Sequence, residues 1–271
     1  MKSSRRNFLL GFGSSIFAMS SLSHFGINRR DNTKSDAINV NTKIIGHRGC
    51  SAKKEDNSIE GIKCAIESGA DGVEIDIHKT KDDRLILNHD PQIITSNDIF
   101  IISRSNIDEL RSSSEEIVLL EEALDLLVEV EDFDIYLDLK SPVIADDVLE
   151  LVKSYELVDS SILLSWSVLT FESVEDSDIR KALVSYFPST QLIDRAYKND
   201  IDAVIPHYTS QNLEYYIQYA HKNNIGCGYW AISDTQDDIE LGLRTQPDFI
   251  ITNRPSYAHK KLIEAEEHMQ Y

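Results

Sequence analysis

The sequence predicts a closed parallel (β/α)₈ barrel, a TIM barrel, with a small insertion after the second strand. Short runs rich in β-branched residues alternate with segments of helical spacing, eight of each. The stretch 42–271 also suits the usual length of such a barrel, about 250 residues. The main alternative is an open doubly wound sheet. No Gly-x-Gly-x-x-Gly run follows any of the predicted strands, which argues against it.

The predicted strands cover residues 43–46, 72–77, 134–139, 161–165, 182–187, 202–205, 226–231 and 248–252. The predicted helices cover 58–68, 120–130, 144–155, 169–176, 189–198, 212–223, 236–244 and 256–267. Residues 85–88 form an extra hairpin-like run behind the second strand. Residues 90–114 fit neither a strand nor a helix, so we expect an insertion without regular structure over the barrel mouth.

The N-terminal segment predicts export. Arg5-Arg6 precede Phe8-Leu9-Leu10 and a short, weakly apolar run, a pattern that resembles a twin-arginine signal. We expect a signal peptide over 1–26, a polar linker over 27–41 and one catalytic domain over 42–271. The expected partner is the twin-arginine translocase, and the expected location is periplasmic or extracellular. An ordinary Sec signal and an uncleaved amphipathic anchor are the alternatives.

The charge balance narrows the possible partners. The chain carries 46 acidic and 27 basic residues, a net charge of −19, which argues against nucleic acid and anionic membranes as ligands. The apolar run after Arg6 is too short and too polar for a stable membrane span. Three cysteines without CxxC spacing predict no disulfide framework, and we expect Cys50 to be a buried filler rather than a nucleophile.

The residues that carry chemistry follow the ends of predicted strands. His47 and Arg48 follow the first strand, Glu74 and Asp76 end the second, and His89 follows the extra run. Active sites of such barrels lie at the C-terminal ends of the strands, so these side chains are expected to meet at one mouth.

Asp138, Lys140 and Trp230 also lie at strand ends and join the same predicted site. Glu74 and Asp76 point to one face of their strand, and with Asp138 they are expected to hold one hard cation. Lys140 is expected to assist with phosphate binding, although an ion pair with Asp138 is the simpler alternative. Trp230 is expected either to stack on the substrate or to pack inside the barrel.

The remaining roles follow from side-chain type. His47 and His89 are suited to proton transfer near neutral pH, and Arg48 to binding a phosphate. Asp56 is expected in a supporting position or as a helix cap rather than as a metal ligand. This set of residues predicts the cleavage of a phosphodiester with a divalent metal ion, Ca²⁺ or Mg²⁺.

An ordered series of motifs resembles the glycerophosphodiester phosphodiesterase family over roughly residues 43–256. The motifs are Gly46-His47-Arg48-Gly49, Glu55-Asp56-Asn57-Ser58, Val73-Glu74-Ile75-Asp76, Thr80-Lys81-Asp82-Asp83, His89-Asp90-Pro91, Leu137-Asp138-Leu139-Lys140 and Thr252-Asn253-Arg254-Pro255. The resemblance implies a TIM-barrel metal enzyme that hydrolyses glycerophosphodiesters to glycerol 3-phosphate and an alcohol. It also implies that the glycerol 2-hydroxyl attacks first, giving a cyclic phosphate that water then opens.

Three motifs depart from the family pattern. Asp56 and Asp138 stand where the family usually has glutamate, and Asn253 stands where it usually has aspartate. Each shortened carboxylate loses one methylene of reach, which a hard cation tolerates if backbone or water adjusts, so the choice between Ca²⁺ and Mg²⁺ stays open. Two other functions remain as alternatives, a phospholipase D-like phosphotransferase of the sphingomyelinase type and a non-catalytic glycerophosphodiester-binding protein.

Overall fold

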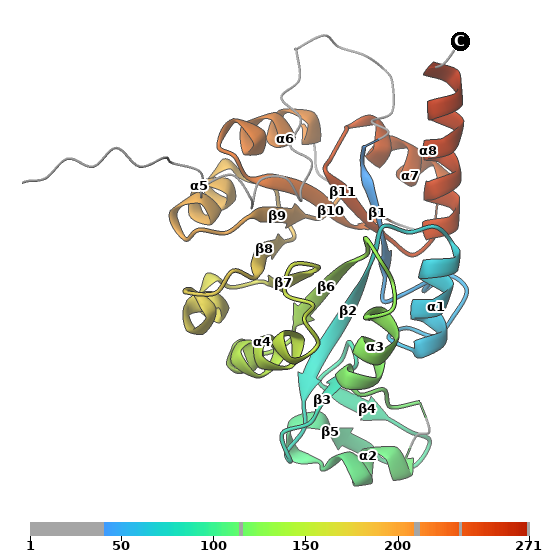
Figure 1. The fold of residues 1–271 in the computed structure, drawn as a ribbon, viewed down its shortest axis with the longest axis vertical. Coiled ribbons are helices and arrows are strands. Elements are labelled where there is room, and N and C mark those ends of the chain that lie inside the picture. Colours follow the sequence, from blue (N-terminus) through green and yellow to red (C-terminus); the bar gives the residue numbers. More distant parts are fainter. Residues whose placement is uncertain (1–40, 114–115, 209–211, 233–234, 270–271) are drawn as a thin grey trace, which may run out of the picture.

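The computed structural model describes residues 41–113, 116–208, 212–232 and 235–269. Within them, parallel strands close into a barrel, because β1 pairs with β11 on one side and with β2 on the other (Figure 1). The barrel strands are β1 Lys43–His47, β2 Gly72–Lys79, β6 Asp134–Leu139, β7 Ser161–Ser165, β8 Arg180–Ser185, β9 Ala203–Pro206, β10 Gly226–Ile232 and β11 Phe249–Thr252. The predicted TIM barrel is confirmed, strand for strand.

Helices surround the barrel in the predicted order (Figure 1). They are α1 Ile59–Glu67, α3 Leu120–Leu127, α4 Ala145–Ser154, α5 Thr190–Lys198, α6 Leu213–Lys222, α7 Gln236–Arg244 and α8 Pro255–Met269. A short 3₁₀ turn, Pro142–Ile144, leads into α4. The predicted helix over 169–176 is instead a 3₁₀ helix, Val168–Val174. Its run of valine, threonine and serine has low α-helix propensity.

Two apolar layers hold the barrel together. Residues inside the barrel, such as Ile45, Tyr136 and Ile205, form one cluster, and the outer faces of the strands pack against the helices in a larger one. This double burial explains why the strands read as continuous apolar runs rather than as an alternation. It also makes the charged residues at their C-terminal ends conspicuous.

The insertion is more regular than predicted. After the short β3, Leu85–Leu87, which pairs antiparallel with β2, come β4 Gln92–Ile94, β5 Ile99–Ile101, the 3₁₀ turn Ile102–Arg104 and α2 Ile107–Ser113. The expectation of a segment without regular structure was therefore wrong. Its two strands were missed because three residues are too few to show periodicity.

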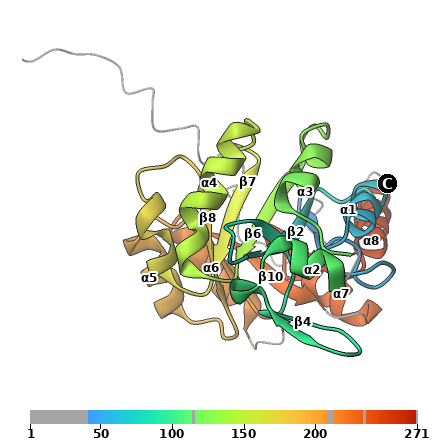
Figure 2. The same cartoon turned by 90° about the horizontal axis from the view of Figure 1, so that it is seen from below.

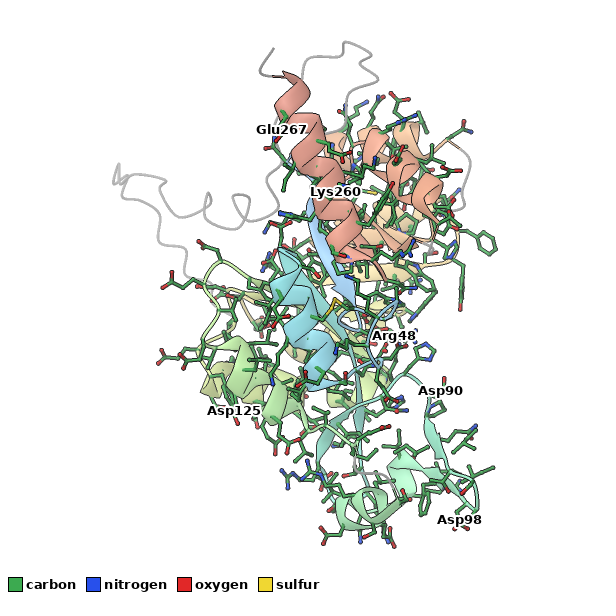
Figure 3. All side chains as sticks on the ribbon, turned by 90° about the vertical axis from the view of Figure 1, so that its right-hand side faces the viewer. Arg48, Asp90, Asp98, Asp125, Lys260 and Glu267 are labelled. Carbon is green, nitrogen blue, oxygen red and sulfur yellow. A yellow bond between two sulfur atoms is a disulfide. The ribbon has the colours of Figure 1, made fainter. Side chains whose placement is uncertain are left out.

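The insertion lies beside α3, where Arg111 of α2 forms an ion pair with Glu122 at 2.7 Å. It has its own small core, which includes Ile86, Ile102 and Leu110. Figure 1 places it at the bottom of the molecule, and Figure 2 shows the β4–β5 hairpin projecting from the barrel. In Figure 3, Asp90 marks the point where the chain leaves for this hairpin and Asp98 marks its tip.

Cys50 and Cys64 form a disulfide between the loop after β1 and helix α1 (Figure 3). Cys50 is buried, as expected, but the expectation that it is only a filler was wrong, because it forms a disulfide that the cysteine spacing did not predict. The two cysteines are 14 residues apart and meet because the loop packs closely on α1, a contact that no local spacing rule encodes. Cys227 is a free buried thiol.

The predicted signal peptide, 1–26, and nearly all of the linker, 27–41, lie outside the described residues. Among the helices that the structure does describe, none combines the length and the apolar character needed to cross a membrane.

Candidate active site

A cleft of about 190 Å³ opens among the C-terminal ends of the barrel strands. Eight of the nine residues predicted for the site line it: His47, Arg48, Glu74, Asp76, His89, Asp138, Lys140 and Trp230. The ninth, Asp56, is not among the lining residues and accepts a hydrogen bond from Arg48 Nη1 at 2.8 Å. The structure therefore brings eight of the nine predicted residues together in one cleft.

A tight left-handed turn after β1 positions the first two site residues. Arg48 and Gly49 have φ angles of +50° and +95°, and a Cβ on Gly49 would collide with the backbone of Gly61 in α1. The turn directs the Arg48 backbone N–H at Glu74, to which it donates at 3.0 Å. Glycine is needed here for both its positive φ and the close approach of the helix.

His47 is oriented by Asn253, at 2.6 Å between Nδ1 and Oδ1. Because an amide oxygen only accepts, Nδ1 carries the proton and Nε2 keeps its lone pair. Nε2 lies 3.9 Å from Glu74 Oε2. Burial, with the charge of Arg48, lowers the pKa of His47 to about 4, so the ring is neutral at pH 7. Asn253 was noted only as a departure from a motif, and its contact with His47 was not predicted.

Glu74, Asp76 and Asp138 form a buried carboxylate trio. Each offers one oxygen, and these atoms all lie within 4.8 Å of one another. Burial, reinforced by the charges of Asp76 and Asp138, raises the pKa of Glu74 well above its usual value. So close a group of carboxylates is costly to ionise unless positive charge is supplied.

Lys140 and Arg48 supply part of that charge. Lys140 Nζ lies 2.6 Å from Asp76 Oδ1 and 2.5 Å from Asp138 Oδ2, and Arg48 Nε lies 3.1 Å from Asp76 Oδ2. Burial acts to raise the pKa of Asp76, but these two cations outweigh it and hold the pKa below its usual value. Burial opposes the charge on Lys140, yet Asp76 and Asp138 raise its pKa above the ordinary value.

Asn57 completes the surroundings of Asp76, and its role was not predicted. With φ of +57°, it donates from Nδ2 to Asp76 Oδ2 at 2.8 Å and accepts from the Asp76 backbone N–H at 2.9 Å. This pair of bonds ties the start of α1 to β2. The only sequence signal was its place in the family motif Glu55-Asp56-Asn57-Ser58.

His89 reaches the cleft from the start of the insertion. Its side chain is about half exposed, unlike that of His47, and its Nδ1 lies 2.8 Å from Asp90 Oδ1. His78, on β2, contacts the His89 carbonyl oxygen at 3.3 Å. The two predicted histidines thus lie in one cleft but in different surroundings, one buried and one open to solvent.

One further observation indicates that the carboxylate trio is suited to hold a divalent cation. Asp138 Oδ1 is buried and has no hydrogen-bond partner, while its other oxygen faces Lys140. A buried carboxylate oxygen without a partner is costly, and a hard cation that prefers oxygen ligands satisfies it. Glu74, Asp76 and Asp138 are therefore the residues that could hold such an ion.

Trp230 lies on the other side of the cleft and donates from Nε1 to the Ser185 carbonyl oxygen at 3.1 Å. It packs against Trp166 and Tyr186, which follow β7 and β8 and also line the cleft. Neither of these two aromatic residues was predicted as part of the site. They lie just beyond or at the end of predicted strands, where aromatic residues are common in any sheet.

Comparison with known proteins identifies the family. The model of the glycerophosphoryl diester phosphodiesterase family matches residues 47–257. A glycerophosphodiester phosphodiesterase of Caldanaerobacter subterraneus subsp. tengcongensis is 25% identical over 235 residues, covering 80% of this chain and 96% of that protein. The chain therefore belongs to the glycerophosphoryl diester phosphodiesterase family and is a phosphodiesterase.

Solved structures share the fold. The glycerophosphodiester phosphodiesterase of Thermotoga maritima superposes with a TM-score of 0.71 at 24% identity, over 81% of this chain and 98% of that one. A phosphodiesterase of Oleispira antarctica, solved in complex with the product sn-glycerol-3-phosphate, gives 0.71 at 17% identity, over 82% and 96%. These similarities support the barrel assignment independently of the motifs.

Proposed function

We propose that this enzyme hydrolyses glycerophosphodiesters to glycerol 3-phosphate and an alcohol, using one divalent metal ion and two histidines. The observation that carries the proposal is the single cleft in which His47 and His89 share space with the carboxylate trio and the unpartnered Asp138 Oδ1. The family membership and the sn-glycerol-3-phosphate named for the Oleispira antarctica structure are consistent with this substrate class.

The two histidines suit different steps. His47 is neutral with a free Nε2, so it takes the proton from the attacking hydroxyl, which is the glycerol 2-hydroxyl in the first step. His89 is exposed and held by Asp90, so it delivers a proton to the alcohol oxygen as the phosphorus–oxygen bond breaks. The reverse assignment is the alternative, and a good leaving group distinguishes the two.

The cation would be Ca²⁺ or Mg²⁺, held by Glu74, Asp76 and Asp138. When bound, it neutralises phosphate charge and polarises phosphorus. Arg48 and Lys140 add positive charge beside the phosphate, where the transition state is most anionic. Lys140 also contacts Asp76 and Asp138, so it holds these two carboxylates in place in addition to its proposed role beside the phosphate.

Turnover of glycerophosphocholine with and without a chelator tests this function. Exhaustive chelation should abolish hydrolysis, and added Ca²⁺ or Mg²⁺ should restore it. Full activity after chelation and dialysis would rule out the metal. Binding without turnover would favour a non-catalytic binding protein, and turnover confined to sphingomyelin or lysophosphatidylcholine would favour the phosphotransferase alternative.

We also propose export through the twin-arginine translocase, on the strength of Arg5-Arg6 before Phe8-Leu9-Leu10. Replacing both arginines with lysine should leave the precursor in the cytoplasm. Fractionation of cells that express either form measures this. Equal export of the two forms, or export from cells that lack the translocase, would contradict it.

A further inference from the structure

Three aromatic rings form a continuous wall on one side of the cleft, named here the aromatic wall: Trp166, Tyr186 and Trp230. The ring centroids of Trp166 and Tyr186 are 4.5 Å apart, and those of Trp166 and Trp230 are 5.3 Å apart. The Trp166 and Trp230 planes are nearly perpendicular, at 88°, so two ring planes meet at a corner.

The aromatic wall and the charged side of the cleft are built on different strands of the barrel. Around the barrel, β1, β2 and β6 are neighbours and carry the charged residues, whereas the aromatic residues belong to β10 and to the loops after β7 and β8. Because both sides line one cleft, a phosphate held by the charged side would leave one of its two ester groups within reach of the aromatic wall. With the glycerol on the charged side, that group is the leaving alcohol.

The exposure of these rings is not explained by packing alone. Tyr186 is 59% exposed and Trp166 is 40% exposed, although both are large and line a cleft. Trp230, by contrast, is anchored by its bond to Ser185 and supports the other two rings. Exposed aromatic faces on a rigid support are suited to binding a ligand.

We propose that the aromatic wall binds the alcohol group of the substrate and favours one that carries a quaternary ammonium cation, such as choline. The inference rests on the proposed function. A cation is attracted to the electron-rich face of an aromatic ring, and tryptophan is the best of the three ring types. Rings that meet at a corner can offer a tetrahedral ammonium group more than one aromatic face at once. The net charge of −19 also attracts cations to the protein.

The chain offers a binding measurement that does not depend on hydrolysis. It has two tryptophans, and both belong to the aromatic wall, so tryptophan fluorescence reports on this subsite. Choline chloride should produce a saturable change in emission. The matched probe is 3,3-dimethylbutan-1-ol, which has the same shape but carries carbon in place of the charged nitrogen. It should bind more weakly by about threefold to thirtyfold.

Variants of Tyr186 connect binding to turnover. Tyr186→Leu should weaken choline binding and lower kcat/KM for glycerophosphocholine relative to uncharged glycerophosphoglycerol, each by about threefold to thirtyfold. Tyr186→Phe keeps the ring and should retain the preference. The matched control is Phe187→Leu, which alters the neighbouring, 79% exposed side chain and should leave both substrates within about twofold.

Equal fluorescence responses to choline and to 3,3-dimethylbutan-1-ol would overturn the proposal, since the rings would then be an apolar surface only. No response to choline, or an equal loss on both diesters in Tyr186→Leu, would overturn it as well. The proposed function is judged separately. It fails if the wild-type enzyme hydrolyses neither diester, whereas the choline response is read without any hydrolysis.

Discussion

The two sides of the cleft are built by different physical means. On the charged side, Asp76 contacts Lys140, Arg48 and Asn57, and the carboxylates of the trio are buried. On the aromatic side, Trp166 and Tyr186 are held by ring contacts and remain accessible. Removing one partner of a buried ion pair leaves an uncompensated charge and is strongly destabilising, whereas stacked rings tolerate substitution by another ring. The charged side is thus suited to chemistry and the aromatic side to substrate choice.

The largest difference between the two sides should appear on changing Asp76. Asp76→Asn keeps the shape but removes the charge that balances Lys140 and Arg48, and it removes one proposed metal ligand. We expect kcat to fall by about 10³-fold or more, with loss of bound metal. Steady-state kinetics and elemental analysis measure both. Asp83→Asn is the control, since that residue contacts Lys79 outside the cleft.

If Asp76→Asn retained both its metal content and its activity, the carboxylate trio would not be the metal site. Substitution on the charged side would then affect activity no more than substitution on the aromatic side, contrary to the difference proposed here.

The histidines should give the next largest effect. His47→Ala and His89→Ala should each lower kcat by about 10²- to 10⁴-fold, and the double variant should lose much less than the product of the two. A p-nitrophenyl ester should restore turnover in the variant that lacks the general acid, since p-nitrophenolate leaves without a proton. Circular dichroism and metal content serve as controls. Activity of either variant within about threefold of wild type on glycerophosphocholine would remove that histidine from the chemistry.

Trp230 should give the smallest effect. Trp230→Phe keeps a ring against Trp166 but loses the hydrogen bond to Ser185. A neutral hydrogen bond contributes about 1 kcal/mol, so kcat/KM should fall by about fivefold or less, mainly through KM. Steady-state kinetics on glycerophosphocholine measures the change. A loss comparable to that of Asp76→Asn would show that the aromatic side takes part in the reaction itself.

The fold was largely predictable because it depends on repeated local patterns. Eight apolar runs alternating with helical segments specify the barrel, and each strand end then predicts where polar residues meet. The exceptions were local patterns too short to recognise, such as β4 and β5 at three residues each. The 3₁₀ helix Val168–Val174 was another, since helical spacing does not separate it from an α-helix at that length.

For the candidate site, residue type and position were enough to propose His47, His89 and the carboxylate trio. Charged residues at the C-terminal ends of buried barrel strands indicate a functional site, because burial without a partner is costly. Their placement in one cleft agrees with the prediction. What could not be obtained in this way are contacts between distant segments. Asn253 touches His47 across 206 residues, and Asn57 matters through its bonds to Asp76.

Strand order and residue chemistry are encoded in the chain as local patterns, so the barrel and the candidate site residues can be predicted from the sequence alone. The closure of the barrel adds what those patterns lack. It sets Trp166 and Tyr186 against Trp230 and leaves Asp138 Oδ1 without a hydrogen-bond partner. These features depend on distances between segments far apart in sequence, and such distances are defined only when all eight strands pack together.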